Sequence, residues 1–357
     1  MTKPTTLILF IALLSANFNY SQSKTFTSVD IEPIVKDSTV NVRALEIIKD
    51  LEIVVFLTSD GRFGAIPTSR KVENDDNFKD GYIIEDIPNT NKSLELNFRA
   101  LSARVAHGYG ITIGNPARLY KIDQQPTLVY EEVHPDVFYD SMEFWNDDEG
   151  LAIGDPTEDC MSIIITRDGG TTWTKLPCDE LPKVVEGEAA FAASDTNIAI
   201  VGDKTWVATG GMASRILYSP DKGKTWEVFD TPIVQGKPTT GIYSIDFYDE
   251  MNGFGIGGDY TRPDNDRRNK IRTSDGGKTW ELLAVGEPPG YRSCVQYVPN
   301  SDANALVAVG FKGIDYSSDA GDSWTHLSDE GFYTLRFMSD SVAYAAGNGK
   351  VAKLTFK

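Results

Sequence analysis

The sequence has 357 residues, of which 41% are hydrophobic and 24% are charged, as in ordinary folded globular proteins. Its formal net charge is -18 at pH 7. Such a surface repels phosphate backbones and anionic headgroups, so the composition excludes nucleic acid as a partner and disfavours an anionic membrane surface.

Residues 1–23, "MTKPTTLILFIALLSANFNYSQS", have the pattern of a secretory signal peptide. A lysine precedes a short apolar run, and small side chains follow at Ser21 and Ser23. The run is too short to span a bilayer, and no later stretch is long and apolar enough to do so. We therefore expect a single mature domain, residues 24–357, that is secreted or periplasmic and has no transmembrane segment.

The rest of the chain repeats a motif of a strand, a polar turn and a second strand that ends at glycine. Such short strands, rich in β-branched and aromatic residues and bounded by turn residues, are typical of an all-β fold. The clearest copies are "FWNDDEGLAIG" (144–154), "FYDEMNGFGIG" (247–257) and "FMSDSVAYAAG" (337–347), and looser copies lie at 49–61, 107–114, 194–202 and 304–310. The sequence therefore contains seven repeat units.

A second motif, Ser/Thr-x-Asp-x-Gly-x-Thr/Ser-Trp, follows the third predicted strand in four of these units. It reads "TRDGGTTW" (166–173), "SPDKGKTW" (219–226), "TSDGGKTW" (273–280) and "SSDAGDSW" (317–324). Successive aspartates are 53, 54 and 44 residues apart, which is about the length of one four-stranded propeller blade.

The repeats predict a seven-bladed β-propeller, with six and eight blades as the alternatives. The last unit supplies only three strands, and the mature start "TFTSVDI" (25–31) has no unit of its own. We expect this N-terminal strand to join the last blade and close the ring, which removes an open sheet edge.

Each copy of the box has a structural explanation. The aspartate accepts backbone N–H bonds across a hairpin, the glycine takes a positive φ, and the tryptophan buries apolar area between blades. These structural residues are Asp168, Gly170, Trp173, Asp221, Gly223, Trp226, Asp275, Gly277, Trp280, Asp319, Gly321 and Trp324.

Cysteine and histidine positions favour a disulfide and no metal site. Cys160 and Cys178 flank the first box hairpin where the two strands face each other, so they are predicted to be bridged, and Cys294 is left as a thiol. The three histidines are isolated in the sequence. Phosphate-loop and dinucleotide-binding motifs are missing too, so we predict no cofactor and assign no catalytic residue.

The boxes resemble the Asp-box (BNR) repeats of sialidases and sortilin-type propellers. The fuller unit is similar to the photosystem II stability/assembly factor family and its bacterial secreted relatives. That resemblance implies a non-enzymatic factor that binds a partner protein. Sialidases carry an Arg-x-Pro motif, which this sequence lacks.

One set of positions is predicted to line a mouth of the central channel. These residues lie four positions before the Phe-like position of each inner strand, with a one-residue slip in the sixth unit. They are Arg43, Arg99, Asp140, Glu188, Tyr243, Arg292 and Tyr333.

We hypothesise that the three arginines of this set form a cationic spot that binds a carboxylate. That carboxylate belongs either to a protein or glycan partner or, in the purely structural alternative, to Asp140 and Glu188. Tyr243 and Tyr333 would add stacking surface. The sequence thus favours a monomeric protein-binding or assembly module. A sialidase-like hydrolase and a non-catalytic glycan-binding module are the alternatives.

Overall fold

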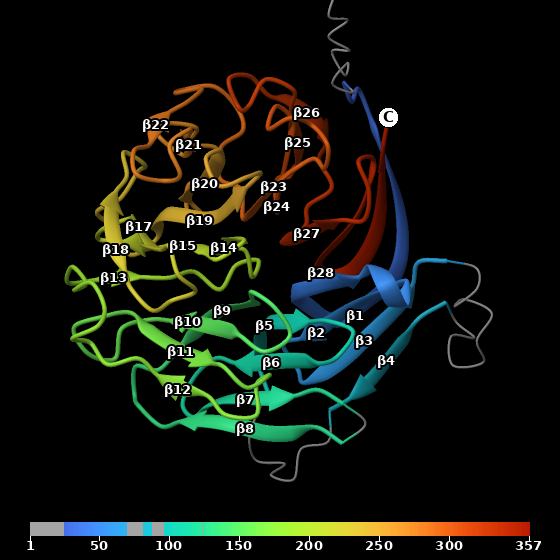
Figure 1. The fold of residues 1–357 in the computed structure, drawn as a ribbon. Helices are drawn as coiled ribbons and strands as arrows, with labels where there is room; N and C mark the ends of the chain where they lie inside the picture. Colours follow the sequence, from blue (N-terminus) through green and yellow to red (C-terminus); the bar gives the residue numbers. More distant parts are fainter. Residues whose placement is uncertain (1–24, 70–80, 88–95, 124) are drawn as a thin grey trace, which may run out of the picture.

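The computed structural model describes residues 25–69, 81–87, 96–123 and 125–357. The predicted signal peptide lies outside these residues. Within them the protein is all-β, apart from one short 3-10 turn at Lys49–Leu51. The sheets are arranged around a central axis, with one strand of each near the axis and another at the outside (Figure 1).

Four of the sheets have four antiparallel strands each. Their strands are β5 (Phe98–Ala103), β6 (Gly108–Thr112), β7 (Ala117–Lys121) and β8 (Thr127–Glu132); β9 (Tyr139–Phe144), β10 (Gly150–Gly154), β11 (Ser162–Thr166) and β12 (Thr174–Lys175); β14 (Ile198–Val201), β15 (Lys204–Ala208), β17 (Arg215–Ser219) and β18 (Glu227–Asp230); and β23 (Cys294–Tyr297), β24 (Leu306–Gly310), β25 (Gly313–Ser317) and β26 (Thr325–Ser328).

The other two sheets are six-stranded. One contains β13 (Glu188–Ala189), β16 (Gly210–Gly211), β19 (Thr240–Phe247), β20 (Gly253–Asp259), β21 (Lys270–Thr273) and β22 (Glu281–Leu282). The second contains β27 (Thr334–Phe337), β28 (Val342–Phe356), β1 (Val29–Ile48), β2 (Ile53–Thr58), β3 (Arg62–Pro67) and β4 (Ile83–Asp86).

The prediction of seven blades is corrected to six, because the described residues form six hydrogen-bonded sheets. The physical reason lies in β1 and β28, which are long, continuous strands that pair side by side (Figure 1). Residues Val29–Lys36 of β1 pair with β28, and residues Val42–Ile48 pair with β2. The first and last repeat units consequently share one sheet.

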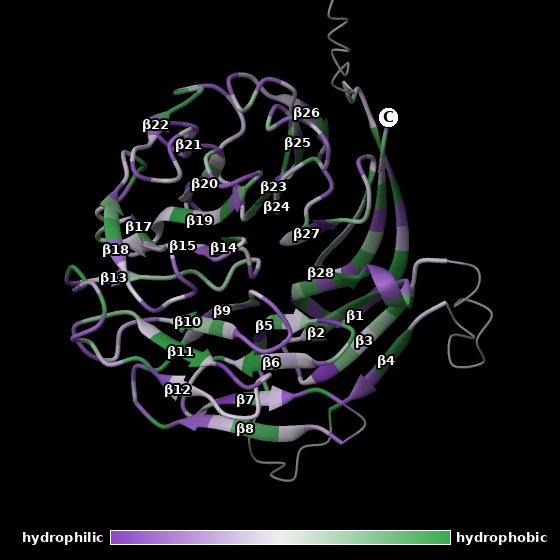
Figure 2. Ribbon diagram, viewed as in Figure 1, coloured by the Kyte–Doolittle hydropathy of each residue, from purple (hydrophilic) through white to green (hydrophobic). Residues whose placement is uncertain are grey.

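Hydrophobic contacts between neighbouring sheets make the core. One buried cluster joins Tyr109 and Leu119 of the second repeat unit to Phe144 and Ile164 of the third. Middle strands such as β10 and β11 are buried along their whole length, whereas the outer β8 is largely exposed. In Figure 2 hydrophobic stretches lie on many of the strands, and many of the connections are hydrophilic. Burial on both faces explains why the middle strands are nearly continuous apolar runs.

Cys160 and Cys178 form a disulfide whose Cα atoms are 5.4 Å apart. They lie just outside β11 and β12, so the bridge joins the open ends of the first box hairpin. Cys294 is free and buried.

We predict that thiol counting on the denatured, non-reduced mature protein finds one reactive thiol. Replacing Cys178 by Ser should lower the free energy of unfolding by about 3 kcal/mol, because the closed loop no longer restricts the unfolded chain. Chemical denaturation of both proteins measures this difference. Three reactive thiols in the unmodified protein would contradict the pairing.

Candidate functional site

The four boxes share one hydrogen-bond pattern, which the first copy illustrates. The Asp168 carboxylate accepts bonds from the backbone N–H of Thr172 (2.8 Å) and from its hydroxyl (2.7 Å). Thr166 donates its hydroxyl proton to Asp168 and accepts the backbone N–H of Gly170. These bonds lower the pKa of Asp168, the Thr172 backbone bond most of all. The same bonds recur around Asp221, Asp275 and Asp319.

Glycine and tryptophan complete each box. The φ of Gly170 is +77°, and a Cβ there would lie 2.3 Å from the ring of Tyr109 in the neighbouring sheet. Only glycine therefore fits this backbone and this close approach. The Trp173 indole N–H donates to the Gly170 carbonyl, and its ring packs on Tyr109 and Phe144. The box closes the hairpin and packs it on the preceding sheet.

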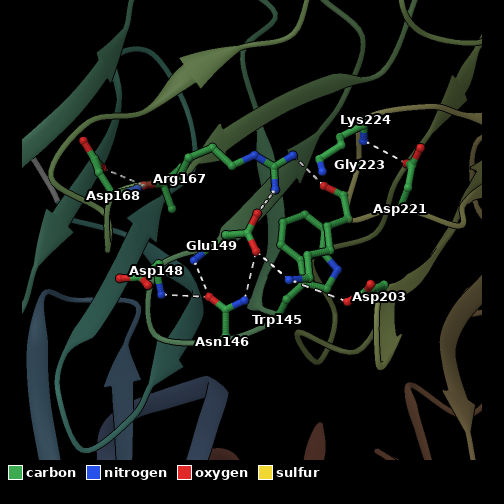
Figure 3. Close-up of polar contacts among 12 residues, drawn as sticks. Trp145, Asn146, Asp148, Glu149, Arg167, Asp168, Asp203, Asp221, Gly223 and Lys224 are labelled. Carbon is green, nitrogen blue, oxygen red and sulfur yellow. Dashed lines mark hydrogen bonds and ion pairs between the residues drawn. The ribbon is translucent and has the colours of Figure 1, made fainter.

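An ion-pair network connects two successive boxes (Figure 3). Glu149, on the hairpin between β9 and β10, accepts Arg167 at 2.8 Å and Lys222 at 2.6 Å. Arg167 also donates to the Lys222 carbonyl and lies over the Trp145 ring. Hydrogen bonds from Lys222, and next from Asn146, lower the pKa of Glu149 to about 2. We call Glu149, Arg167 and Lys222 the box latch.

The centre of the channel is filled by residues 193–196, which we call the hub segment. The Asp195 carboxylate accepts the backbone N–H of Leu101 in β5 (2.8 Å) and of Met142 in β9 (3.1 Å). Burial raises the pKa of Asp195 well above its ordinary value. One side chain thus ties together two neighbouring sheets at the axis.

Other atoms of the hub segment reach the remaining sheets. The Ser194 carbonyl accepts Thr334 of β27, and the Ser194 hydroxyl donates to the carbonyl of Ser293, just before β23. The Thr196 carbonyl accepts the backbone N–H of Ile245 in β19 at 2.8 Å. The Asp195 carbonyl accepts the Arg336 guanidinium, which also pairs with Glu46 of β1. The hub segment separates the two ends of the channel.

Three of the predicted mouth residues meet at one end. The Arg43 guanidinium lies 4.1 Å from the centre of the Tyr333 ring and donates to the Ala193 carbonyl. Arg99 donates its Nε–H to Asn97. Burial, followed by repulsion from Arg43, lowers the pKa of Arg99 to about 10.

Asp140 acts electrostatically on Arg99 and has no exposed surface. Among the residues that the structure describes, neither of its carboxylate oxygens has a hydrogen-bond partner. Burial, followed by the nearby Asp155, raises its pKa well above the ordinary value, and burial raises the pKa of Asp155 to about 6. Raised carboxyl pKa values are what a sialidase-like acid would need. The burial of Asp140, however, keeps its oxygens from a substrate.

We call Arg43 and Arg99 the arginine pair. Two other charged residues of the predicted set, Arg292 and Glu188, have partners elsewhere. Arg292 forms a buried ion pair with Asp315, with Nη2 2.5 Å from Oδ2, and Glu188 pairs with Arg215 at 2.6 Å. The hypothesis of a three-arginine spot is therefore corrected to two. Arg292 lies two residues before β23, and its side chain pairs with Asp315 of β25.

Tyr243, another residue of the predicted mouth set, is buried. It stacks on Phe191 with ring centres 4.0 Å apart and meets Tyr291 edge-on at 4.8 Å. Sequence reasoning missed Tyr291, which precedes the misplaced Arg292 and lies close enough to Arg43 to influence its pKa. A slip of two residues in the sixth unit would have been needed to find it.

The opposite end of the channel has a different character, and sequence reasoning did not identify it. A cavity of about 360 Å³ there is lined by Glu143, Asp246, Gln296 and Arg336, among others. Burial, followed by repulsion from Glu46, raises the pKa of Glu143 to about 7, and burial raises that of Asp246 to about 6. These residues lie about three positions after the predicted mouth set. Reading the same alignment about three positions further along each inner strand would have found them.

Within the described ranges, no group of three His, Cys, Asp or Glu side chains is arranged to hold a metal ion. No helix in the same part of the chain has the length and apolar character needed to cross a membrane.

No protein-family model matches the sequence, and no curated protein matches it. Solved structures match over most of the chain. YCF48 bound to a D1 peptide has a TM-score of 0.63 at 12% identity, covering 94% of this chain and 99% of that one. U3-55K has 0.60 at 11% (92% and 98%), and the Pan2 WD40 domain of Neurospora crassa has 0.59 at 11% (93% and 94%). This likeness shows the fold: the chain is a β-propeller.

We predict that the box latch makes stability pH-dependent. The folded-state pKa of Glu149 lies below its ordinary 4.5, so ionised Glu149 stabilises the fold above that pH and ceases to do so as the pH falls towards 2. Glu149→Gln should cost about 1–3 kcal/mol at pH 7 and flatten this dependence. Denaturation between pH 2 and 7 tests it against Glu227→Gln on β18. Equal pH profiles for the two variants would refute the role of the latch.

We predict that Asp195→Ala lowers the free energy of unfolding by about 2–5 kcal/mol, because two buried backbone N–H groups lose their acceptor. Asp195→Asn keeps an acceptor for one of them and should cost less. Thermal and chemical unfolding measure both, with the exposed Asp230→Ala as control. If Asp195→Ala is no more harmful than Asp230→Ala, the hub segment does not hold the sheets.

Proposed function

We propose that this protein is an exported binding module, in which Arg43 and Arg99 at the channel mouth bind an anionic group of a partner protein. The same proposal has four further parts. The pairing of β1 with β28 closes the ring, and the chain is related to the photosystem II stability/assembly factor family. The protein is a monomer and acts in assembly. The disulfide between Cys160 and Cys178 suits an oxidising compartment outside the cytoplasm.

The state of the two arginines carries this proposal. Among the described residues Arg43 donates only to the Ala193 carbonyl, and Arg99 only to the Asn97 side chain. Neither forms an ion pair there, although the chain has an excess of acidic residues. By contrast Arg215, Arg292 and Arg336 are all paired. Asp140 is the carboxyl group that acts electrostatically on Arg99, but burial raises its pKa well above the ordinary value, so it offers little negative charge. Partly buried guanidinium groups in this position favour an external carboxylate, which restores the lost interactions.

The similar structures add support of a general kind. YCF48, whose fold this chain shares, has been solved with a D1 peptide bound. Propellers offer one face, with the channel mouth at its centre, for such contacts. We therefore propose a protein partner in preference to a glycan.

We predict that Arg99→Ala weakens partner binding by about 2–5 kcal/mol and leaves the stability of the fold unchanged or slightly higher. The partner is first isolated on the mature protein, and its affinity is then measured for the wild type, Arg99→Ala and Arg99→Lys. Arg167→Ala in the box latch serves as control, since it lies away from the mouth. Full affinity of Arg99→Ala, combined with a loss of stability, would show that the arginine is only structural.

A further inference from the structure

The mouth that contains Arg43 and Arg99 has a second half made of aromatic rings. Six rings contribute, and we call them the aromatic shelf. They come from the segment before β14, from β19, from the turns after β20 and β24, and from the approaches to β23 and β27. The shelf consists of Phe191, Tyr243, Tyr260, Tyr291, Phe311 and Tyr333.

Five of these rings form one connected set. Tyr291 is at its centre, with ring centres 4.8 Å from Tyr243, 5.4 Å from Phe311 and 6.4 Å from Tyr260. Phe191 extends the set by stacking on Tyr243 at an angle of only 5°. Such contacts fix the rings in place before any ligand arrives, which reduces the entropy lost on binding.

The shelf has a buried floor and exposed outer rings. Tyr243 and Tyr291 are buried, at 3% and 4% exposure, and form its floor. Tyr260 and Phe311, which contact that floor, are 49% and 43% exposed. Two large rings left in solvent beside a buried aromatic floor are a feature of binding surfaces, because burying them on a partner is favourable.

The two halves of the mouth adjoin at Tyr333. The Arg43 guanidinium lies over the Tyr333 ring, and both groups act electrostatically on Tyr291, whose pKa burial raises. On one side of this junction the mouth presents the N–H groups of Arg43 and Arg99. On the other it presents apolar ring faces. A ligand that fills the mouth therefore meets a cationic region directly beside a stacking region.

We propose that the mouth binds a peptide segment in which a carboxylate side chain stands next to an aromatic or proline side chain. The inference rests on the proposed function and specifies its partner. The carboxylate binds the arginine pair, while the neighbouring ring stacks on Phe311 and Tyr260. A peptide fits better than a sugar acid, because the exposed Phe311 ring has no polar group for a sugar hydroxyl and the Tyr243 hydroxyl already donates to the Thr239 carbonyl.

The test uses three blocked tetrapeptides and glucuronate in ligand-observed NMR titrations of the mature protein. The first probe is acetyl-Gly-Asp-Phe-Gly-amide. The second replaces its Asp by Asn, and the third replaces its Phe by Ala. We expect the first to bind about three- to tenfold more tightly than either of the others. Phe311→Ala and Tyr260→Ala should abolish the preference for Phe and keep the preference for Asp. Met251→Ala, an equally exposed side chain on the turn between β19 and β20, should change neither.

The other outcomes separate the two proposals. A preference for Asp without one for Phe, or a Phe preference that survives in both shelf variants, overturns the shelf inference and leaves the proposed function standing. Equal binding of the Asp and Asn peptides overturns both. Glucuronate that binds more tightly than all three peptides, and loses affinity in Arg99→Ala, overturns the peptide assignment in favour of a glycan.

Discussion

The carboxylate of Asp195 is the interaction on which the arrangement of the sheets depends. The sheets of a propeller spread outward from its axis, and their inner strands lie close together there. Contacts at the axis therefore set how the sheets are placed. Asp195 accepts backbone N–H groups from two sheets, and its own carbonyl accepts Arg336 from a third. Burial raises the pKa of Asp195, so placing this carboxyl group at the axis costs free energy, and the backbone N–H groups of Leu101 and Met142 offset part of that cost.

The boxes connect neighbouring sheets at the periphery, as the hub segment connects them at the axis. Each box satisfies its own turn with an aspartate and then places a tryptophan against the preceding sheet. Local hydrogen bonds and contacts between sheets are therefore built from the same eight residues. The box latch adds a connection between successive copies, through Glu149, Arg167 and Lys222.

With the axis filled and the periphery fixed, the ends of the channel are free to carry function. They differ in charge, because one end exposes the arginine pair beside the aromatic shelf, and the other gathers Glu143, Asp246 and Arg336 around a cavity. The same inner strands supply both ends. Positions only three residues apart on one strand therefore serve opposite surfaces of the molecule.

The sequence by itself determined the all-β propeller class, since the spacing of the repeats and the box residues reflect local turn chemistry. The placement of Arg43 and Tyr333 also follows from the repeats, because equivalent positions recur at the same end of each inner strand. The number of sheets does not, since it depends on β1 and β28 pairing across more than 300 residues of chain. Only the tertiary structure decided that Arg292 pairs with Asp315, that Tyr291 takes its place at the mouth, and that residues 193–196 fill the axis. These outcomes arise from side-chain contacts between distant segments, which leave no periodic signal in the sequence.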